Sequence, residues 1–177
     1  MSKKNNFIFI FVIIFLLAAS MLVKHPFNFT PIIAMSIFGG CYLRKKIAVL
    51  IPLSAMVIGD YFIGFYDWKL MAFVYIGVAV SFYIGWALKK RFKWQNVIYA
   101  SLLSSVIFFI LTNFSVWFFS GWYPRTLAGL SDCFRMALPF FRNSLIGDFI
   151  YTGVIFGSYE LVCRILSRQN IIKQMTN

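Results

Sequence analysis

Long apolar runs alternate with short polar breaks along the whole chain. A membrane-spanning helix needs about 20 apolar residues, and slightly shorter runs are tolerated. Six runs meet this standard: residues 7–23, 27–43, 47–65, 70–88, 97–119 and 144–162. The breaks carry charged or helix-stopping residues, as in Arg44-Lys45-Lys46, and none is long enough to separate domains. The pattern therefore predicts an all-α integral membrane protein in which residues 1–177 form a single six-transmembrane-helix bundle.

Two segments fit this pattern less well. Residues 126–141 are apolar but contain Asp132, Arg135 and Pro139, so we expect a short interfacial helix, or cap segment, between the fifth and sixth helices. The second run is interrupted by Pro26, Pro31, Gly39 and Gly40. We expect that run to form two half-helices or one strongly kinked helix.

The composition agrees with a membrane protein. The chain is 61% hydrophobic and 12% charged, whereas soluble domains are about a quarter charged, which excludes a soluble enzyme, a disordered tail and a nucleic-acid-binding module. The net charge of +12 comes from basic clusters between the apolar runs, so it sets orientation in the lipid bilayer and does not indicate a nucleic-acid partner. With six crossings and a cytoplasmic N-terminus, twelve basic residues lie inside and five outside. This split predicts that both ends are cytoplasmic.

The first run resembles a signal peptide, with Lys3-Lys4 before it and Ala18-Ala19-Ser20 as a candidate cleavage site. We expect an uncleaved anchor, because its removal would leave five crossings.

Catalytic and metal chemistry find little support. The single histidine, His25, and three cysteines without a CxxC pair predict no metal site, and the phosphate-binding pattern GxxxxGK[ST] is missing. We therefore expect no cofactor and no enzymatic activity. The carboxylates of Asp60 and Asp148 could act as general acid and base, but nearby arginines would favour the ionised form of both.

Three acids fall inside the predicted crossings, where each charge is a candidate for function. Glu160 is expected to form a local ion pair with Arg164, four residues on. Asp60, Asn113 and Asp148 lie on three different helices, each about 6–9 Å below the outer boundary when counted at 1.5 Å per residue. This common depth predicts a site near the outer face.

The outer loops add further polar and aromatic side chains. Tyr123, Arg125, Arg142 and Asn143 would lie above the three polar residues, a composition typical of a small-molecule site. Two interpretations remain open. The residues could line a ligand pocket, or Asp60 and Asp148 could pair with the two arginines and lock the cap segment onto the bundle.

Small residues four apart indicate close helix contacts. They occur at Gly77, Ser81 and Gly85 in the fourth run and at Gly153 and Gly157 in the sixth. We expect packing within the bundle, with docking of another subunit as the alternative.

Several motifs occur in an order that resembles a family of small bacterial inner-membrane proteins of no established function. They are Asn28-Phe29-Thr30-Pro31, Phe38-Gly39-Gly40, Gly59-Asp60, Leu111-Thr112-Asn113-Phe114, Tyr123-Pro124-Arg125-Thr126 with Gly129-Leu130, and Pro139-Phe140-Phe141-Arg142-Asn143 with Gly147-Asp148. That family in turn resembles the S components, the substrate-binding subunits of energy-coupling-factor vitamin transporters. The resemblance implies a location in the bacterial inner membrane and a pocket that includes Asp60, Asn113, Arg142, Asn143 and Asp148.

The same resemblance implies a transmembrane coupling subunit and ATPases as partners. However, S components usually dock through an Ala-xxx-Ala face on the first helix, and here only Ala18-Ala19 occurs, on the wrong side of the membrane. Either Gly77, Ser81 and Gly85 replace that face or the protein works alone. The leading hypothesis is a membrane transport protein that captures a small molecule, such as a vitamin, from the outer face. The alternative is a structural or assembly subunit of a membrane complex, without a ligand of its own.

Overall fold

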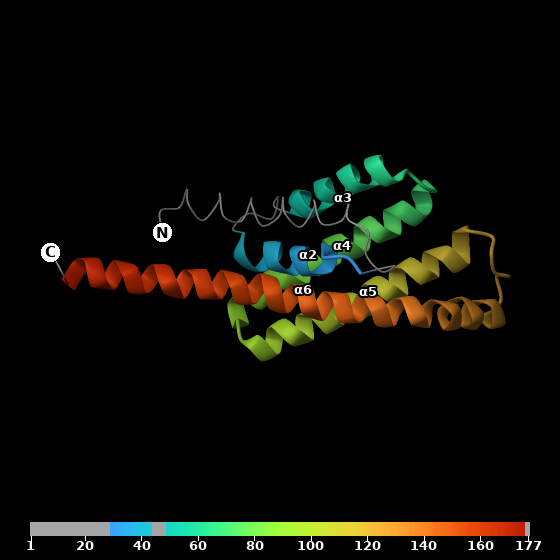
Figure 1. Ribbon diagram of the computed structural model, residues 1–177. Helices are drawn as coiled ribbons and strands as arrows, with labels where there is room; N and C mark the ends of the chain where they lie inside the picture. Colours follow the sequence, from blue (N-terminus) through green and yellow to red (C-terminus); the bar gives the residue numbers. More distant parts are fainter. Residues whose placement is uncertain (1–28, 44–48, 176–177) are drawn as a thin grey trace.

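The computed structural model describes residues 29–43 and 49–175 (Figure 1). Of these residues, 87% are helical and none lies in a strand, which confirms the predicted all-helical class. The elements are α2 (Ile32–Tyr42), α3 (Leu50–Ile63), α4 (Trp68–Leu88), the 3₁₀ helix η2 (Lys89–Arg91), α5 (Trp94–Phe119) and α6 (Leu127–Met175).

Three of these helices, α4, α5 and α6, are long and apolar enough to cross a membrane. The protein therefore has the architecture of a helical membrane protein. By contrast, α2 and α3 have 11 and 14 residues. At 1.5 Å per residue they are about 17 and 21 Å long, shorter than the roughly 30 Å of hydrocarbon. The helices of the described residues do not support six crossings, and the first predicted crossing, 7–23, lies outside those residues.

Local sequence explains where α3 ends and α4 begins. Gly64 adopts φ 114° directly after α3, a left-handed conformation that glycine accepts without strain. Asp67 caps α4, because its carboxylate accepts a hydrogen bond from the backbone N–H of Lys69 at 2.8 Å. The break between the predicted runs 47–65 and 70–88 therefore contains the N-terminus of a helix.

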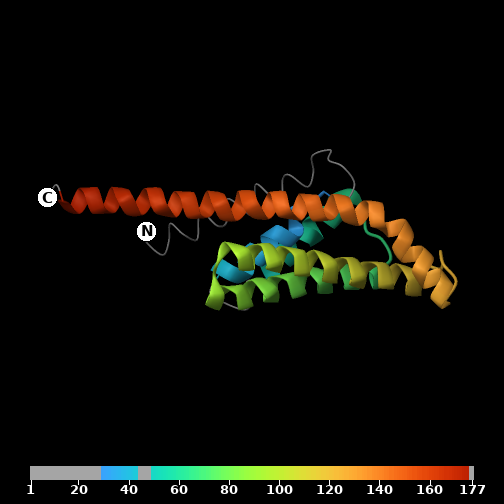
Figure 2. The ribbon, with the colours of Figure 1, turned by 90° about the horizontal axis from the view of Figure 1, so that it is seen from below.

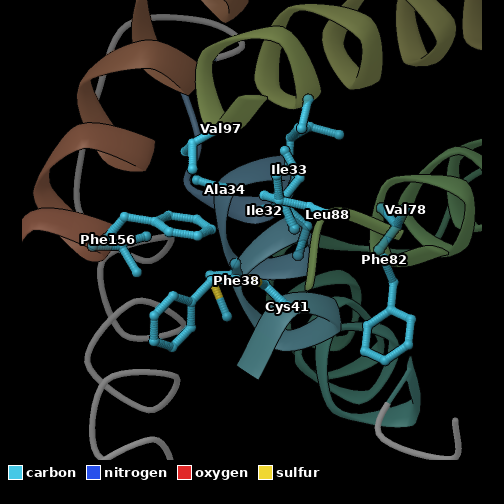
Figure 3. Packing of buried hydrophobic residues seen from close by; sticks show 14 of the residues in the cluster. Ile32, Ile33, Ala34, Phe38, Cys41, Val78, Phe82, Leu88, Val97 and Phe156 are labelled. Atoms are coloured by element: carbon cyan, nitrogen blue, oxygen red, sulfur yellow. The ribbon is translucent and has the colours of Figure 1, made fainter. Parts of the chain in front are cut away.

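The short helix α2 forms the centre of the packed core. All of its residues from Ile32 to Cys41 are buried. Figure 3 shows the α2 side chains between Phe156 of α6 on one side and Val78 and Phe82 of α4 on the other, with Val97 of α5 nearby. A helix that is apolar on every face is stable only when protein or lipid surrounds it, and here the other helices do so.

Two glycines bring the backbones of α2 and α4 together. A Cβ atom at Gly40 would lie 2.0 Å from the backbone oxygen of Phe82, and one at Gly85 would lie 2.1 Å from that of Ile37. The expected interruption of α2 at Gly39 and Gly40 is therefore wrong, since the helix runs through both. Gly39 and Gly40 remain helical because close packing of α2 against α4 supports the backbone there.

The small-residue face of α4 packs inside the bundle, as expected. Gly85 contacts α2, Ser81 is fully buried, and a Cβ atom at Gly77 would lie 2.7 Å from the ring of Phe108 in α5. This face is therefore not free to dock a coupling subunit. The second predicted face behaves differently, because no described atom lies within 4 Å of a Cβ atom at Gly153 or Gly157.

The predicted cap segment 126–141 is not a separate element. Its residues from Leu127 onward form the first part of α6, which continues without interruption to Met175 and contains Pro139. Figure 2 shows that α6 bends within its orange stretch. A proline inside a helix bends it because the ring removes one backbone hydrogen bond and clashes with the preceding turn.

The first part of α6 remains helical because it packs along α5. The ring of Phe109 contacts Phe134 and Phe141, with centroids 5.4 and 4.4 Å apart. Cys133 is buried, and its Sγ lies 3.5 Å from the backbone oxygen of Asn113. At its other end α6 runs past the remaining described helices (Figures 1 and 2).

Candidate functional site

Buried polar side chains gather between α5 and α6. Asp148 is 4% exposed, and its Oδ2 accepts a hydrogen bond from Ser105 Oγ at 2.6 Å. Ser101, one helical turn before Ser105, and Thr152, one turn after Asp148, form a second pair, with Ser101 Oγ and Thr152 Oγ1 3.3 Å apart. All four side chains are at most 4% exposed. We call these four residues the α5–α6 polar cluster.

The contacts between α5 and α6 fix the depth of this cluster. The helices run antiparallel, since Cys133 lies beside Asn113, Phe141 beside Phe109 and Asp148 beside Ser105. Ser105 lies 14 residues before Phe119, the end of α5, which corresponds to about 21 Å along the helix axis. Asp148 therefore faces the middle of α5.

The expectation that Asp60, Asn113 and Asp148 share one depth is wrong for Asp148. Asn113 lies six residues, or about 9 Å, from the end of α5. Asp148 lies deeper because α6 begins at Leu127, so that 21 residues precede it in the helix. The sequence estimate counted from residue 144, which is not a helix end.

The ion pairs of the second interpretation, in which Arg125 and Arg142 lock the cap segment, do not form among the described residues. The Arg125 guanidinium lies over the Phe118 ring, 4.9 Å from its centroid, and Arg142 is exposed. Within the described residues, 29–43 and 49–175, no basic side chain forms an ion pair with Asp60 or Asp148. The first part of α6 is instead held against α5 by aromatic contacts.

Asp60 belongs to a second polar group, near the C-terminal end of α3 and in the N-terminal half of α4. It accepts a hydrogen bond from the hydroxyl of Tyr75 in α4 at 2.7 Å. Partial burial raises the pKa of Tyr66, in the loop between these helices, to about 12, and the negative charge of Asp60 adds to the rise. Tyr66 therefore keeps its proton at neutral pH and can donate a hydrogen bond.

The remaining predicted site residues lie along α5, α6 and the loop that joins them. The amide nitrogen of Asn113 donates to the backbone oxygen of Phe109 at 2.8 Å, and Tyr123 and Asn143 are partly buried. In the described part of the chain, no hydrogen bond or ion pair joins any two of the seven predicted site residues. Their joint role in one pocket stays a prediction.

Sequence reasoning missed the serines of α5 and the threonine of α6. Ser101, Ser104 and Ser105 repeat at the spacing of one helix face, and Thr152 follows Asp148 by four residues. This spacing was the available signal. Ser104 is fully buried, and its Oγ has no hydrogen-bond partner among the described atoms. It lies one turn before Phe108, on the side of α5 that faces α4.

Glu160 is held by a different group from the one expected. Its Oε1 accepts a hydrogen bond from the hydroxyl of Tyr42 in α2 at 2.7 Å. No ion pair with Arg164 forms among the described residues, so the predicted local pair is wrong. The contact with Tyr42 joins α2 to α6, which explains an acid at this position without a ligand.

Together, the apolar helices and the buried polar cluster define a helical membrane protein with a polar site inside its bundle. The sequence pattern of the family of unknown function DUF6580 matches residues 1–171, so the chain belongs to that family. No curated protein and no solved structure matches the chain. The expectation of an uncharacterised family is confirmed, whereas the further resemblance to S components finds no support in these comparisons.

Proposed function

We propose that this protein is a membrane transport protein that takes up a small molecule from the outer side. The observation that carries the proposal is the burial of Asp148 deep in the bundle, with hydroxyl groups as its neighbours and without a basic partner among the described residues. A carboxylate at this depth is costly, and such residues usually mark a binding site or a pathway. An ion-paired structural lock would have given it an arginine.

Two polar levels support uptake from outside. Asp60, with Tyr75 and Tyr66, offers hydrogen-bonding groups near the outer end of the bundle, and Asp148 offers them at its middle. A small substrate with polar groups, such as a vitamin, would meet the first level and then the second. Asn113, Tyr123, Arg125, Arg142 and Asn143 would complete the outer level.

The proposal includes a topology. Six crossings with both ends cytoplasmic in a bacterial inner membrane place twelve basic residues inside and five outside, in agreement with the positive-inside rule. In this topology the described short helices α2 and α3 would cross together with flanking residues. A coupling subunit and ATPases, if used as in S components, would need a docking face other than the buried one on α4.

One observation favours the alternative, a structural or assembly subunit. On α6, Gly153 and Gly157 have open space beside them within the described structure, and Val154 and Leu161 are each 59% exposed. Small residues beside large apolar ones suit close packing of another membrane helix. This face would dock another subunit whether or not the protein binds a ligand.

The deciding experiment is native mass spectrometry of the full chain purified in mild detergent from cells grown in rich medium. Wild type is compared with Asp148→Asn and Asp60→Asn. Asp132→Asn serves as a matched control, because it removes an exposed acid of α6. We expect a bound small molecule in wild type and in the control, and its loss in the Asp148 variant.

Near-equal melting temperatures of the four proteins would show that the variants fold. If wild type carries no small molecule and other membrane subunits co-purify with it, the structural alternative holds. Retention of the ligand in both acid variants would refute the assigned site, although not uptake itself.

A further inference from the structure

We propose that the α5–α6 polar cluster is a binding site for Na⁺. The site consists of the Asp148 carboxylate, the hydroxyls of Ser105, Ser101 and Thr152, and the backbone oxygen of Ser101. These oxygens come from two antiparallel helices and are all buried in the bundle.

The hydrogen bond between Ser101 and Thr152 is long for two hydroxyl groups. Ser101 Oγ and Thr152 Oγ1 are 3.3 Å apart, whereas hydroxyl hydrogen bonds cluster near 2.7–2.8 Å. Oxygen ligands lie about 2.3–2.6 Å from a hard cation such as Ca²⁺. Two oxygens that are each about 2.4 Å from one ion, and at right angles to each other as seen from it, would lie about 3.4 Å apart. The observed separation is therefore close to the spacing of two neighbouring oxygen ligands of one ion.

Ser105 also has lone pairs available for an ion, because its hydroxyl carries a single proton. Ser105 Oγ lies 2.6 Å from Asp148 Oδ2 and 2.9 Å from the backbone oxygen of Ser101, but it can donate to only one of them. When it donates to the carboxylate, its lone pairs and the second lone pair of the Ser101 oxygen remain available. An ion would use these lone pairs.

The charge of the cluster selects a monovalent ion. One carboxylate balances one positive charge, and the other ligands are neutral. Among the described residues no group of three His, Cys, Asp or Glu side chains comes together, as a divalent transition metal would favour. No described lysine or arginine neutralises Asp148, so a bound cation would compensate a charge that is otherwise costly to bury.

This inference goes beyond uptake, since it gives the protein a site for an ion that could drive transport. It does not depend on the identity of the organic substrate. Ion binding can therefore be measured on the purified protein, and its failure would leave the uptake proposal untouched.

The test is the thermal unfolding midpoint of the full-length protein in detergent, titrated with NaCl, KCl or choline chloride at constant ionic strength and pH. We expect NaCl alone to raise the midpoint with saturation. Ser105→Ala and Thr152→Val each remove one ligand and should raise the half-saturating NaCl concentration about tenfold, the effect of losing about 1.4 kcal/mol. Asp148→Asn should abolish the response.

Ser115→Ala is the matched control, because Ser115 is a buried serine of α5 that donates to its own helix, away from the cluster. It should respond to NaCl like wild type. Isothermal titration with NaCl covers any variant whose midpoint is too low to follow. Equal midpoints in the three salts would overturn the proposal, and so would a sodium response that survives in Asp148→Asn. A midpoint that depends on pH but not on sodium would show that a proton neutralises Asp148, which also overturns it.

Discussion

At the scale of single residues, the acids within the helices, one buried and two partly buried, are stabilised by hydroxyl groups from neighbouring helices. Tyr42 donates to Glu160, Tyr75 to Asp60 and Ser105 to Asp148. Each bond joins two helices, so each acid contributes to packing as well as to polarity. A hydrogen bond to a charged group contributes about 1.5–3 kcal/mol to stability, and leaving the charge unpaired costs at least as much.

Replacing Tyr42 with Phe should therefore destabilise the protein. The ring remains in its aromatic cluster, but Glu160 loses the hydroxyl that satisfies its carboxylate. We expect a loss of about 1.5–3 kcal/mol, measured as a lower melting temperature in detergent. Tyr99→Phe is the control, because Tyr99 is 68% exposed, and it should leave the melting temperature unchanged. Equal melting temperatures of the two variants would contradict the assigned contact.

At the scale of helices, the central packing depends on glycine between α2 and α4. Ala at Gly40 would place a Cβ atom 2.0 Å from the Phe82 backbone oxygen, so one helix must move. We expect Gly40→Ala to cost about 3 kcal/mol, the upper range of overpacking, despite the better helix propensity of alanine.

The matched control for this variant is Gly153→Ala on α6, where no described atom lies within 4 Å of the new Cβ. It should be neutral or slightly stabilising, because alanine favours the helix by about 1 kcal/mol over glycine. Both are measured by thermal unfolding in the same detergent. If Gly153→Ala is as damaging as Gly40→Ala, then a further segment or subunit packs closely on that face of α6.

Aromatic contacts hold the first part of α6 against α5. Phe109→Ala removes the ring that meets Phe134 and Phe141, and we expect it to cost about 2 kcal/mol, less than the 3–5 kcal/mol of a fully buried ring. Phe140→Ala, at a position that is 46% exposed, should cost much less. Hydrogen exchange of residues 127–141 provides a second measurement. Exchange should speed up in Phe109→Ala, and unchanged exchange would mean that other contacts hold this part of α6.

At the scale of the whole molecule, the proposed topology predicts which loops face which side. A reporter enzyme active only outside the cytoplasm should work when inserted at Gly121, in the loop between α5 and α6. The same reporter inserted after Arg91, beside η2, should be inactive, whereas a cytoplasmic fluorescent reporter should work there. The reason is the basic cluster at residues 89–93, which the positive-inside rule retains in the cytoplasm. The reverse pattern would invert the orientation, and equal activity at both sites would deny that α5 crosses.

The bend in α6 also belongs to this scale. A proline within an apolar stretch marks either the end of a helix or a kink, and sequence alone does not distinguish the two. Here α6 passes through Pro139 because the aromatic surface of α5 supports the residues before it. The position of the deep acid follows from that continuity, since Asp148 lies 21 residues into the helix and reaches the level of Ser105.

The sequence by itself determined the membrane class, the helices α4 and α5 to within a few residues, and Asp60 and Asp148 as residues inside the apolar runs. These properties depend on the apolar or charged character of each residue and on capping groups such as Asp67, which are all local. Only the tertiary structure decided the partner of each acid, the role of Gly40 and Gly85, and the fate of the segment around Pro139. Those outcomes depend on which side chain of another helix lies opposite, and this is fixed by how the helices pack together.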